Sequence, residues 1–106
     1  MITAQRAYDV IRQAIIDRHQ IVCFYNGFHR YCCPHTIGRT NGTSRVLVYQ
    51  FGGNSSSGLP AGGEWRCMDI PAMTGLKTIS GPWHTDMRHS KQQTCVKHVD
   101  LDITMT

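Results

Sequence analysis

The feature that most constrains the fold of this chain is a strand–loop–strand unit near its middle. Segments 45–51 and 64–70 are rich in the branched and aromatic residues that favour β-strands. Between them, residues 52–63 are mostly glycine, serine and other small residues that cannot build a core. A loop of this length without its own secondary structure is uncommon in a compact domain, and is usually either functional or disordered. The unit therefore predicts a β-rich domain whose central loop is either a binding loop or a slack connection.

Size and composition indicate one folded domain over residues 1–106. The chain has 106 residues, of which 41% are hydrophobic and 17% are charged, which is typical of a globule rather than a disordered tail. The net charge of +4 favours a polyanionic partner over a polycationic one. No segment reaches the ~18–20 apolar residues that span a bilayer, and the N-terminus lacks a signal-peptide pattern. We therefore expect a cytoplasmic protein whose five cysteines are reduced thiols.

The chain begins with an amphipathic pattern that predicts a helix over residues 3–19. Thr3 is the expected N-cap, because its hydroxyl can accept a hydrogen bond from a free backbone N–H of the first turn. The apolar residues recur at helical spacing and form one stripe, which consists of Ala7, Val10, Ile11, Ala14 and Ile15. We expect this stripe to pack against a sheet.

The remainder of the chain reads as short strands separated by turns. The dipeptides Asn26-Gly27 and Asn41-Gly42 suit the positive φ angles of type I′ hairpin turns, and Pro34 suits a strand end. The predicted strands cover residues 21–25, 28–33, 36–39, 44–51, 64–70, 76–79 and 95–103. One helix followed by such strands, over about residues 20–103, predicts a mainly β fold: a small, strongly bent β-barrel with one N-terminal α-helix.

The order of these elements resembles the WYL domain. The matching elements, which span roughly residues 8–79, are the leading helix, Tyr25-Asn26-Gly27, Arg30, Pro34, Gly38, Gly42, the strand 45–49, and Trp65-Arg66-Cys67-Met68. At the position of the tripeptide that names the family this chain has Arg45-Val46-Leu47, so only the leucine is retained. The resemblance implies an Sm/SH3-like β-barrel, here in a divergent stand-alone form, that senses ligands in bacterial regulators. It also implies binding of nucleotides or nucleic acid rather than catalysis.

Several side chains could bind such a ligand. Arginine pairs in a bidentate manner with phosphate, tyrosine stacks on bases, and serine hydroxyls with backbone N–H groups can cradle phosphate oxygens. The loop has no Walker A lysine and no following helix, so it is not a P-loop. The predicted ligand-binding residues are Arg30, Arg45, Tyr49, Gln50, Ser55, Ser56, Ser57, Arg66 and His84. Phe24 and Trp65 are expected in the core.

The sequence gives weaker support for a metal site or a catalytic site. Cys32 and Cys33 are adjacent, so on a strand they point to opposite faces and are poorly placed to share a zinc ion. His35 and His84 could act as an acid–base pair on RNA, or could activate a cysteine, but no nucleophile or metal motif accompanies them. We therefore predict a non-enzymatic binding module for nucleotides or single-stranded nucleic acid, without cofactor or metal. The alternatives are a structural interaction module or homodimer, and a small metal-independent hydrolase or nuclease.

Overall fold

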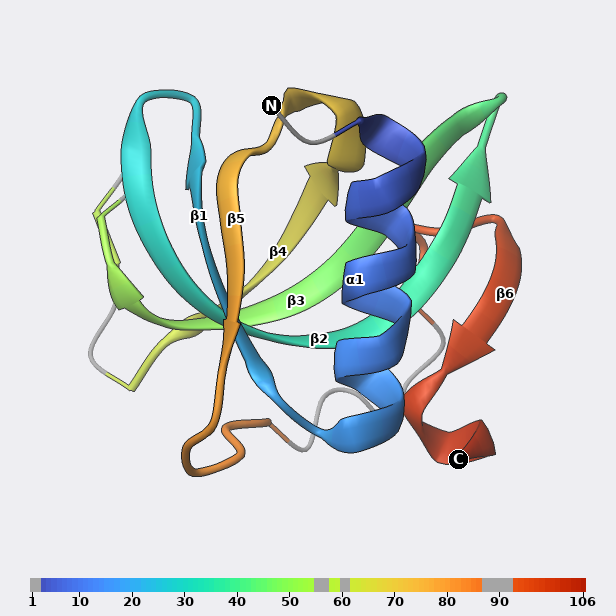
Figure 1. Ribbon diagram of the computed structural model, residues 1–106. Coiled ribbons are helices and arrows are strands. Elements are labelled where there is room, and N and C mark those ends of the chain that lie inside the picture. Colours follow the sequence, from blue (N-terminus) through green and yellow to red (C-terminus); the bar gives the residue numbers. More distant parts are fainter. Residues whose placement is uncertain (1–2, 55–57, 60–61, 87–92) are drawn as a thin grey trace.

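The structure of the chain is a computed structural model, and it describes residues 3–54, 58–59, 62–86 and 93–106. Over these residues it has one helix, six strands and two short 3₁₀ turns. These elements are α1 (Ala4–Asp17), β1 (Gln20–Tyr25), β2 (Phe28–Thr40), β3 (Thr43–Gly53), β4 (Glu64–Asp69), η1 (Ile70–Ala72), β5 (Thr74–Ile79), β6 (His98–Asp102) and η3 (Ile103–Met105). Figure 1 shows α1 lying against one face of a strongly bent sheet. The prediction of a mainly β fold with one N-terminal helix is confirmed.

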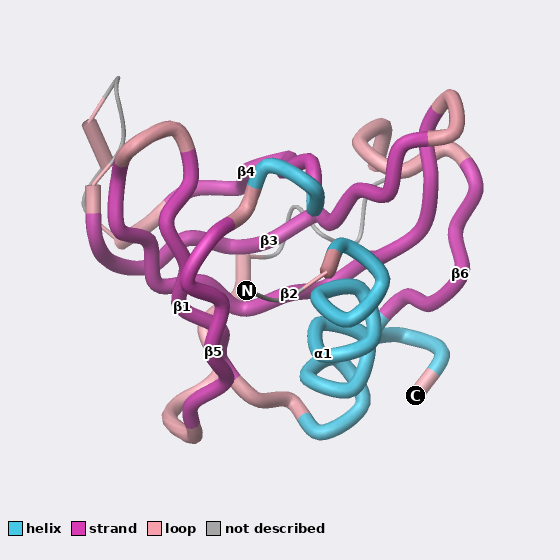
Figure 2. The backbone as a smooth tube through the Cα atoms, turned by 45° about the horizontal axis from the view of Figure 1, so that its top comes forward, coloured by secondary structure: helices cyan, strands magenta, loops and turns pink. Residues whose placement is uncertain are grey.

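The six described strands belong to one antiparallel sheet, in which five follow the order β4-β3-β2-β1-β5 and β6 pairs with β2 off this path. The 13-residue strand β2 is long enough to pair with β1 along its first half and with β6 along its second half. The tube in Figure 2 shows how β2 and β3 bend between these two ends. Within the described residues no ladder joins β4 to β5, so the sheet is not closed into a barrel. Instead, the backbone N–H of Asp69 donates to the Tyr25 hydroxyl at 3.0 Å and links the ends of β4 and β1.

The helix forms where the apolar stripe predicts it, although it is shorter at both ends. The Thr3 hydroxyl accepts from the Arg6 N–H at 3.1 Å, which confirms Thr3 as the N-cap. Arg18 ends the helix in the left-handed conformation, with φ of 53°. The buried face of α1 packs into the main core, and its members are Ala7, Tyr8, Ile11, Ala14 and Ile15.

Both predicted hairpins are present with the expected turn geometry. Asn26 and Gly27 have φ of 52° and 80°, and Asn41 and Gly42 have φ of 51° and 82°. Positive φ at both central residues is the mark of a type I′ turn, which matches the right-handed twist of the strands. Asparagine and glycine tolerate these angles, which is why the sequence located the turns correctly.

Two strand predictions were wrong. Residues 28–33 and 36–39 form one strand rather than two, because Pro34 lies at a shift of register opposite Val48, where a missing backbone donor is tolerated. Residues 95–97 do not extend the last strand, which begins at His98. Cys95 and Val96 are instead buried against the sheet.

Two predictions about side chains also need correction. Phe24 is not in the core, since it lies on the solvent side of β1 and is 48% exposed. The five cysteines are not all thiols, because Cys67 and Cys95 form a disulfide, while Cys23, Cys32 and Cys33 are free and buried. Alternation along a strand shows which residues share a face, but it does not show which loop covers that face. Within the described part of the chain, no helix is long and apolar enough to cross a membrane.

Candidate functional site

The two faces of the bent sheet sort the predicted site residues into separate groups. On β3, the side chains of Val46, Val48 and Gln50 point to the inner face, which α1 covers, and are fully buried. Directly opposite residues of antiparallel strands point to the same side, so Arg66, which pairs with Val48, also belongs to the inner face. Tyr49 and its partner Trp65 point to the outer face.

Arg30 is the most deeply buried charged residue of the predicted set. It is 4% exposed, and its guanidinium donates to the Tyr25 carbonyl at 3.1 and 3.3 Å and to Gln50 Oε1 at 3.3 Å. The rings of Tyr25 and Phe28 lie 5.4 and 5.9 Å from its Cζ atom, so the cation is also surrounded by π-faces. All of these acceptors are neutral. Among the described residues, no carboxylate forms an ion pair with Arg30.

Arg66 approaches the same inner region from β4. Its Nη2 atom lies 2.6 Å from Glu64 Oε2 and donates to the Gly58 carbonyl at 3.2 Å. Burial raises the pKa of Cys32, whereas the nearby guanidiniums of Arg30 and Arg66 act to lower it. Two of the three predicted arginines therefore converge on one end of the inner face, around Cys32 and Gln50.

Tyr49, Gln50 and Arg66 hold the backbone on both sides of the Gly/Ser loop. Gln50 Nε2 donates to the carbonyls of Gly52 and Asn54, at 3.0 and 3.1 Å. The Tyr49 hydroxyl donates to the Gly62 carbonyl at 2.7 Å, and Arg66 reaches Gly58. Gln50 and Tyr49 thus bind the two ends of the loop, and Arg66 binds Gly58 between them. The predicted residues Ser55, Ser56 and Ser57 lie outside the described part of the chain.

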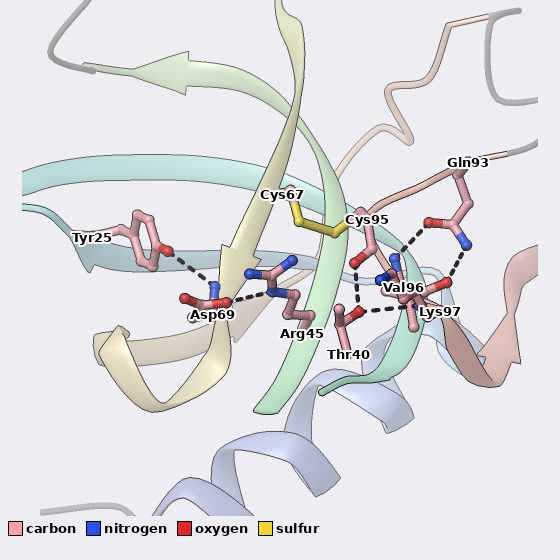
Figure 3. Close-up of polar contacts among 9 residues, drawn as sticks. All are labelled: Tyr25, Thr40, Arg45, Cys67, Asp69, Gln93, Cys95, Val96 and Lys97. Atoms are coloured by element: carbon pink, nitrogen blue, oxygen red, sulfur yellow. Dashed lines mark hydrogen bonds and ion pairs between the residues drawn. A yellow bond between two sulfur atoms is a disulfide. The ribbon is translucent and has the colours of Figure 1, made fainter. Parts of the chain in front are cut away.

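Arg45 does not join this group. It lies near the opposite end of β3, on the outer face, where its Nε donates to Asp69 Oδ1 at 2.7 Å (Figure 3). His84 lies on the outer face as well, with its ring stacked on Phe51 at a centroid distance of 4.1 Å. The structure therefore brings together Arg30, Gln50 and Arg66, and separates them from Arg45 and His84.

The outer face carries a row of rings that sequence reasoning recognised only in part. The outer ring row consists of Phe24, His29, Tyr31, Phe51 and His84. Successive centroids are 4.8, 4.9, 6.4 and 4.1 Å apart, and the two end pairs are stacked within about 20° of parallel. The signal that could have identified the row is the two-residue spacing of His29 and Tyr31, with Phe24 opposite His29 across the first hairpin.

His35 lies in a second, buried cluster on the outer face. It is 1% exposed, its Nδ1 lies 2.8 Å from the Cys33 carbonyl oxygen, and its Nε2 lies 2.9 Å from the Thr85 hydroxyl. The rings of Trp65 and Trp83 pack on it at 4.6 and 5.0 Å. His35 is thus a packed structural residue, which removes one member of the proposed acid–base pair from solvent.

The cysteines are unsuited to the covalent mechanism considered above. Burial raises the pKa of Cys23 to about 11 and also raises the pKa values of Cys32 and Cys33, whereas a nucleophilic cysteine needs a lowered pKa. The predicted opposite orientation of Cys32 and Cys33 is confirmed. Cys32 belongs to the inner core, while Cys33 Sγ accepts a hydrogen bond from the His84 N–H on the outer face. Cys95 is not a thiol, because its sulfur is in the disulfide with Cys67.

Comparisons with protein-family models, with curated proteins and with solved structures found no match to this chain.

Proposed function

We propose that this protein is a non-enzymatic binding module for nucleotides or single-stranded nucleic acid, of the WYL type, with its strongly bent sheet as an open variant of the Sm/SH3-like fold. The observation that carries the proposal is the buried guanidinium of Arg30. Removing a cation from water costs several kcal/mol unless a counter-charge and hydrogen bonds compensate for it. Arg30 has hydrogen bonds to neutral oxygens and no carboxylate partner in the described residues. A ligand phosphate would supply the missing negative charge.

The surroundings of Arg30 support an anionic ligand of this kind. Gln50 and Arg66 lie at the same end of the inner face, and both bind the backbone of the Gly/Ser loop. A phosphate that entered here would meet a second guanidinium and polar backbone groups of the loop. A phosphate could take the place of Glu64 or Gly58 on Arg66, because guanidinium groups bind phosphate in the same fork geometry as carboxylate. The N–H donors of Arg66 would then serve the ligand.

The outer ring row favours a strand of nucleotides as an additional ligand form. Aromatic side chains contribute about 1–3 kcal/mol per stacked base, with little dependence on sequence. In the row Phe24 is exposed and the other four rings are partly exposed. The row contains no carboxylate, and the exposed Lys77 of β5 lies on the same face, since it pairs with Val22, which pairs with Tyr31. A single strand could therefore stack its bases there while its phosphates meet Lys77.

The test is a thermal-shift screen of the purified chain against mononucleotides, cyclic dinucleotides and short single-stranded oligonucleotides. A ligand at a hundredfold excess over its dissociation constant should stabilise the fold by ~2.7 kcal/mol. The affinity should fall as salt rises, because neutralised phosphates release counterions. Arg30→Met should abolish the shift. Arg45→Met is the matched control, because Arg45 lies on the other face and is paired with Asp69, and it should retain the shift.

Three results would count against the proposal. These are the absence of a shift with every compound of the panel, an affinity that does not change with salt, and an equal loss of binding in Arg30→Met and Arg45→Met. Turnover of any RNA or nucleotide by the purified chain would instead favour the hydrolase alternative.

A further inference from the structure

A groove lies between α1 and β5, towards the C-terminal end of the helix. Figures 1 and 2 both show these two elements side by side. The groove has a volume of about 190 Å³, and a cavity needs only ~10–15 Å³ to hold one water molecule. It is therefore large enough for a small organic ligand. The described residues that line it are Val10, Gln13, Ala14 and Asp17 of α1, His19 of the following turn, and Thr78 of β5.

The groove has an apolar floor and a polar rim. Positions 10, 13, 14 and 17 follow the i, i+3, i+4, i+7 spacing, so they share one side of α1. Val10 and Ala14 form the floor, and Ala14 is only 2% exposed. Thr78 belongs to the inner face of the sheet, because it pairs with the buried Ile21. The exposed rim residues are Gln13, Asp17, His19 and Thr78.

Every polar side chain of the rim can accept a hydrogen bond. The carboxylate of Asp17 only accepts, and the Thr78 hydroxyl and a neutral imidazole at His19 can also accept. Gln13 Nε2 donates to both carboxylate oxygens of Asp17, each at 3.1 Å, which leaves Gln13 Oε1 as a further acceptor. The rim is thus suited to a ligand with several N–H donors.

The charge at the groove is negative, although the chain as a whole has a net charge of +4. The last turn of α1 contains Asp17 and no basic residue, so this carboxylate adds to the negative end of the helix dipole. Two cations nearby in the sequence are directed elsewhere. Arg18 donates to the Ile103 carbonyl at 3.4 Å, and Lys77, next to Thr78, points to the opposite face of the sheet. No lysine or arginine is among the described residues of the lining.

We propose that this groove binds a small primary alkylammonium ion. The ammonium group donates its three N–H bonds to Asp17 and to the other acceptors of the rim, while the alkyl chain lies on Val10 and Ala14. The ligand is opposite in charge to the one proposed for Arg30, and different elements form the two sites. The inference therefore goes beyond the proposed function and does not depend on it.

The experiment is an NMR titration of the ¹⁵N-labelled chain with n-butylammonium chloride, with sodium chloride added to hold the ionic strength constant. It is run at pH 8, where imidazole is neutral. We expect saturable amide shifts that are largest at residues 10–19 and 78. A buried methylene is worth up to about fourfold in affinity, so methylammonium, which lacks three of them, should bind at least about fivefold more weakly. n-Butanol, which lacks the charge, should bind about threefold more weakly.

Two variants of α1 test the role of the carboxylate. Asp17→Asn removes the charge and preserves the size of the side chain, so it should weaken n-butylammonium binding by about threefold. Asp9→Asn is the matched control, because Asp9 accepts from Gln5 at 3.0 Å in the same i, i+4 arrangement. Asp9 lies about 12 Å further along the helix axis and outside the lining, so this variant should bind as the wild type does.

A capped lysine, N-acetyl-lysine N-methylamide, distinguishes the two sources of an alkylammonium group. Tighter binding of this compound than of n-butylammonium would assign the groove to a lysine side chain of a peptide, and weaker binding would assign it to a free amine. The proposal is overturned if n-butanol binds as tightly as n-butylammonium, or if the amide shifts do not cluster at the groove. Unchanged affinity in Asp17→Asn, or an equal loss in Asp9→Asn, would also overturn it.

Discussion

Gln50 accepts a hydrogen bond from Arg30 inside the bent sheet, with Nη1 and Oε1 3.3 Å apart. Gln50 is fully buried and Arg30 nearly so, and the two residues come from neighbouring strands. Gln50 also donates to the backbone that begins the Gly/Ser loop. This pair therefore connects a buried cation to the segment that the sequence marks as the candidate binding loop.

We expect Arg30 and Gln50 to be energetically coupled. In a double-mutant cycle of Arg30→Met and Gln50→Leu, the interaction energy should be about 1.5–3 kcal/mol, the range for a hydrogen bond to a charged group. Urea unfolding of the wild type, both single variants and the double variant measures it. If the changes in unfolding free energy of the two single variants add to within ~0.5 kcal/mol of the double variant, Arg30 and Gln50 contribute to stability independently.

The disulfide should contribute substantially to stability. It joins residues separated by 28 positions, and the chain-entropy model gives about 3.5 kcal/mol for a closed loop of this length. Cys67→Ser/Cys95→Ser should lower the free energy of unfolding by a similar amount, measured by urea unfolding without reductant. Repeating the measurement with dithiothreitol is the control, because the difference between wild type and variant should then largely disappear. A difference of equal size under both conditions would contradict the entropic explanation.

The link between α1 and β6 should weaken in acid. Asp100 accepts from the Tyr8 hydroxyl at 2.6 Å and from Arg12 Nε at 3.0 Å, and these hydrogen bonds lower the pKa of its carboxyl below the ordinary value. A depressed pKa in the folded state means that the contribution to stability is present above the ordinary pKa. It is lost as pH falls through the folded value, in the acid range below about pH 4.

The same contact involves the opposite shift at Tyr8. Burial, then the hydrogen bond to Asp100, raises the pKa of Tyr8 to about 12, so its contribution is present below pH 10 and is lost as the pH rises toward 12.

Asp100→Asn should reduce the loss of stability in acid, as measured by thermal unfolding between pH 2 and 7. Asp9→Asn, on the exposed face of α1, is the control. An unchanged acid profile in Asp100→Asn would show that other carboxylates dominate.

Two glycines with nearly the same φ angle should differ in their tolerance of alanine. Gly53 has φ of 84°, and a Cβ atom there would overlap the His29 carbonyl oxygen. Gly58 has φ of 79°, but a Cβ atom there meets nothing within 4 Å. Gly58→Ala should cost about 1–2 kcal/mol from the left-handed backbone alone, and Gly53→Ala should cost clearly more. Both costs are measured by urea unfolding. Equal costs would mean that β2 can move away from the added methyl group without further loss of stability.

Local patterns in the sequence determined most of the secondary structure. The apolar stripe and the Thr3 cap located α1, and the two Asn-Gly pairs located the hairpins, because these signals depend on nearby residues along the chain. Alternation along a strand also placed Cys32 and Cys33 on opposite faces correctly. Pro34 misled the prediction, because its missing donor is tolerated at a shift of register that no local signal reveals.

Tertiary structure alone decided which side chains meet. Arg30 and Arg66 are 36 positions apart, and only the pairing of β2, β3 and β4 brings them to the same inner region and leaves Arg45 on the outer face. The disulfide has the same origin, because Cys67 and Cys95 are 28 positions apart and meet only in the folded chain. The sequence by itself determined the helix, the turns and the β-rich class, since each depends on local backbone preference and periodicity. The buried cation, the outer ring row and the disulfide depend on contacts between distant segments, which only the folded sheet specifies.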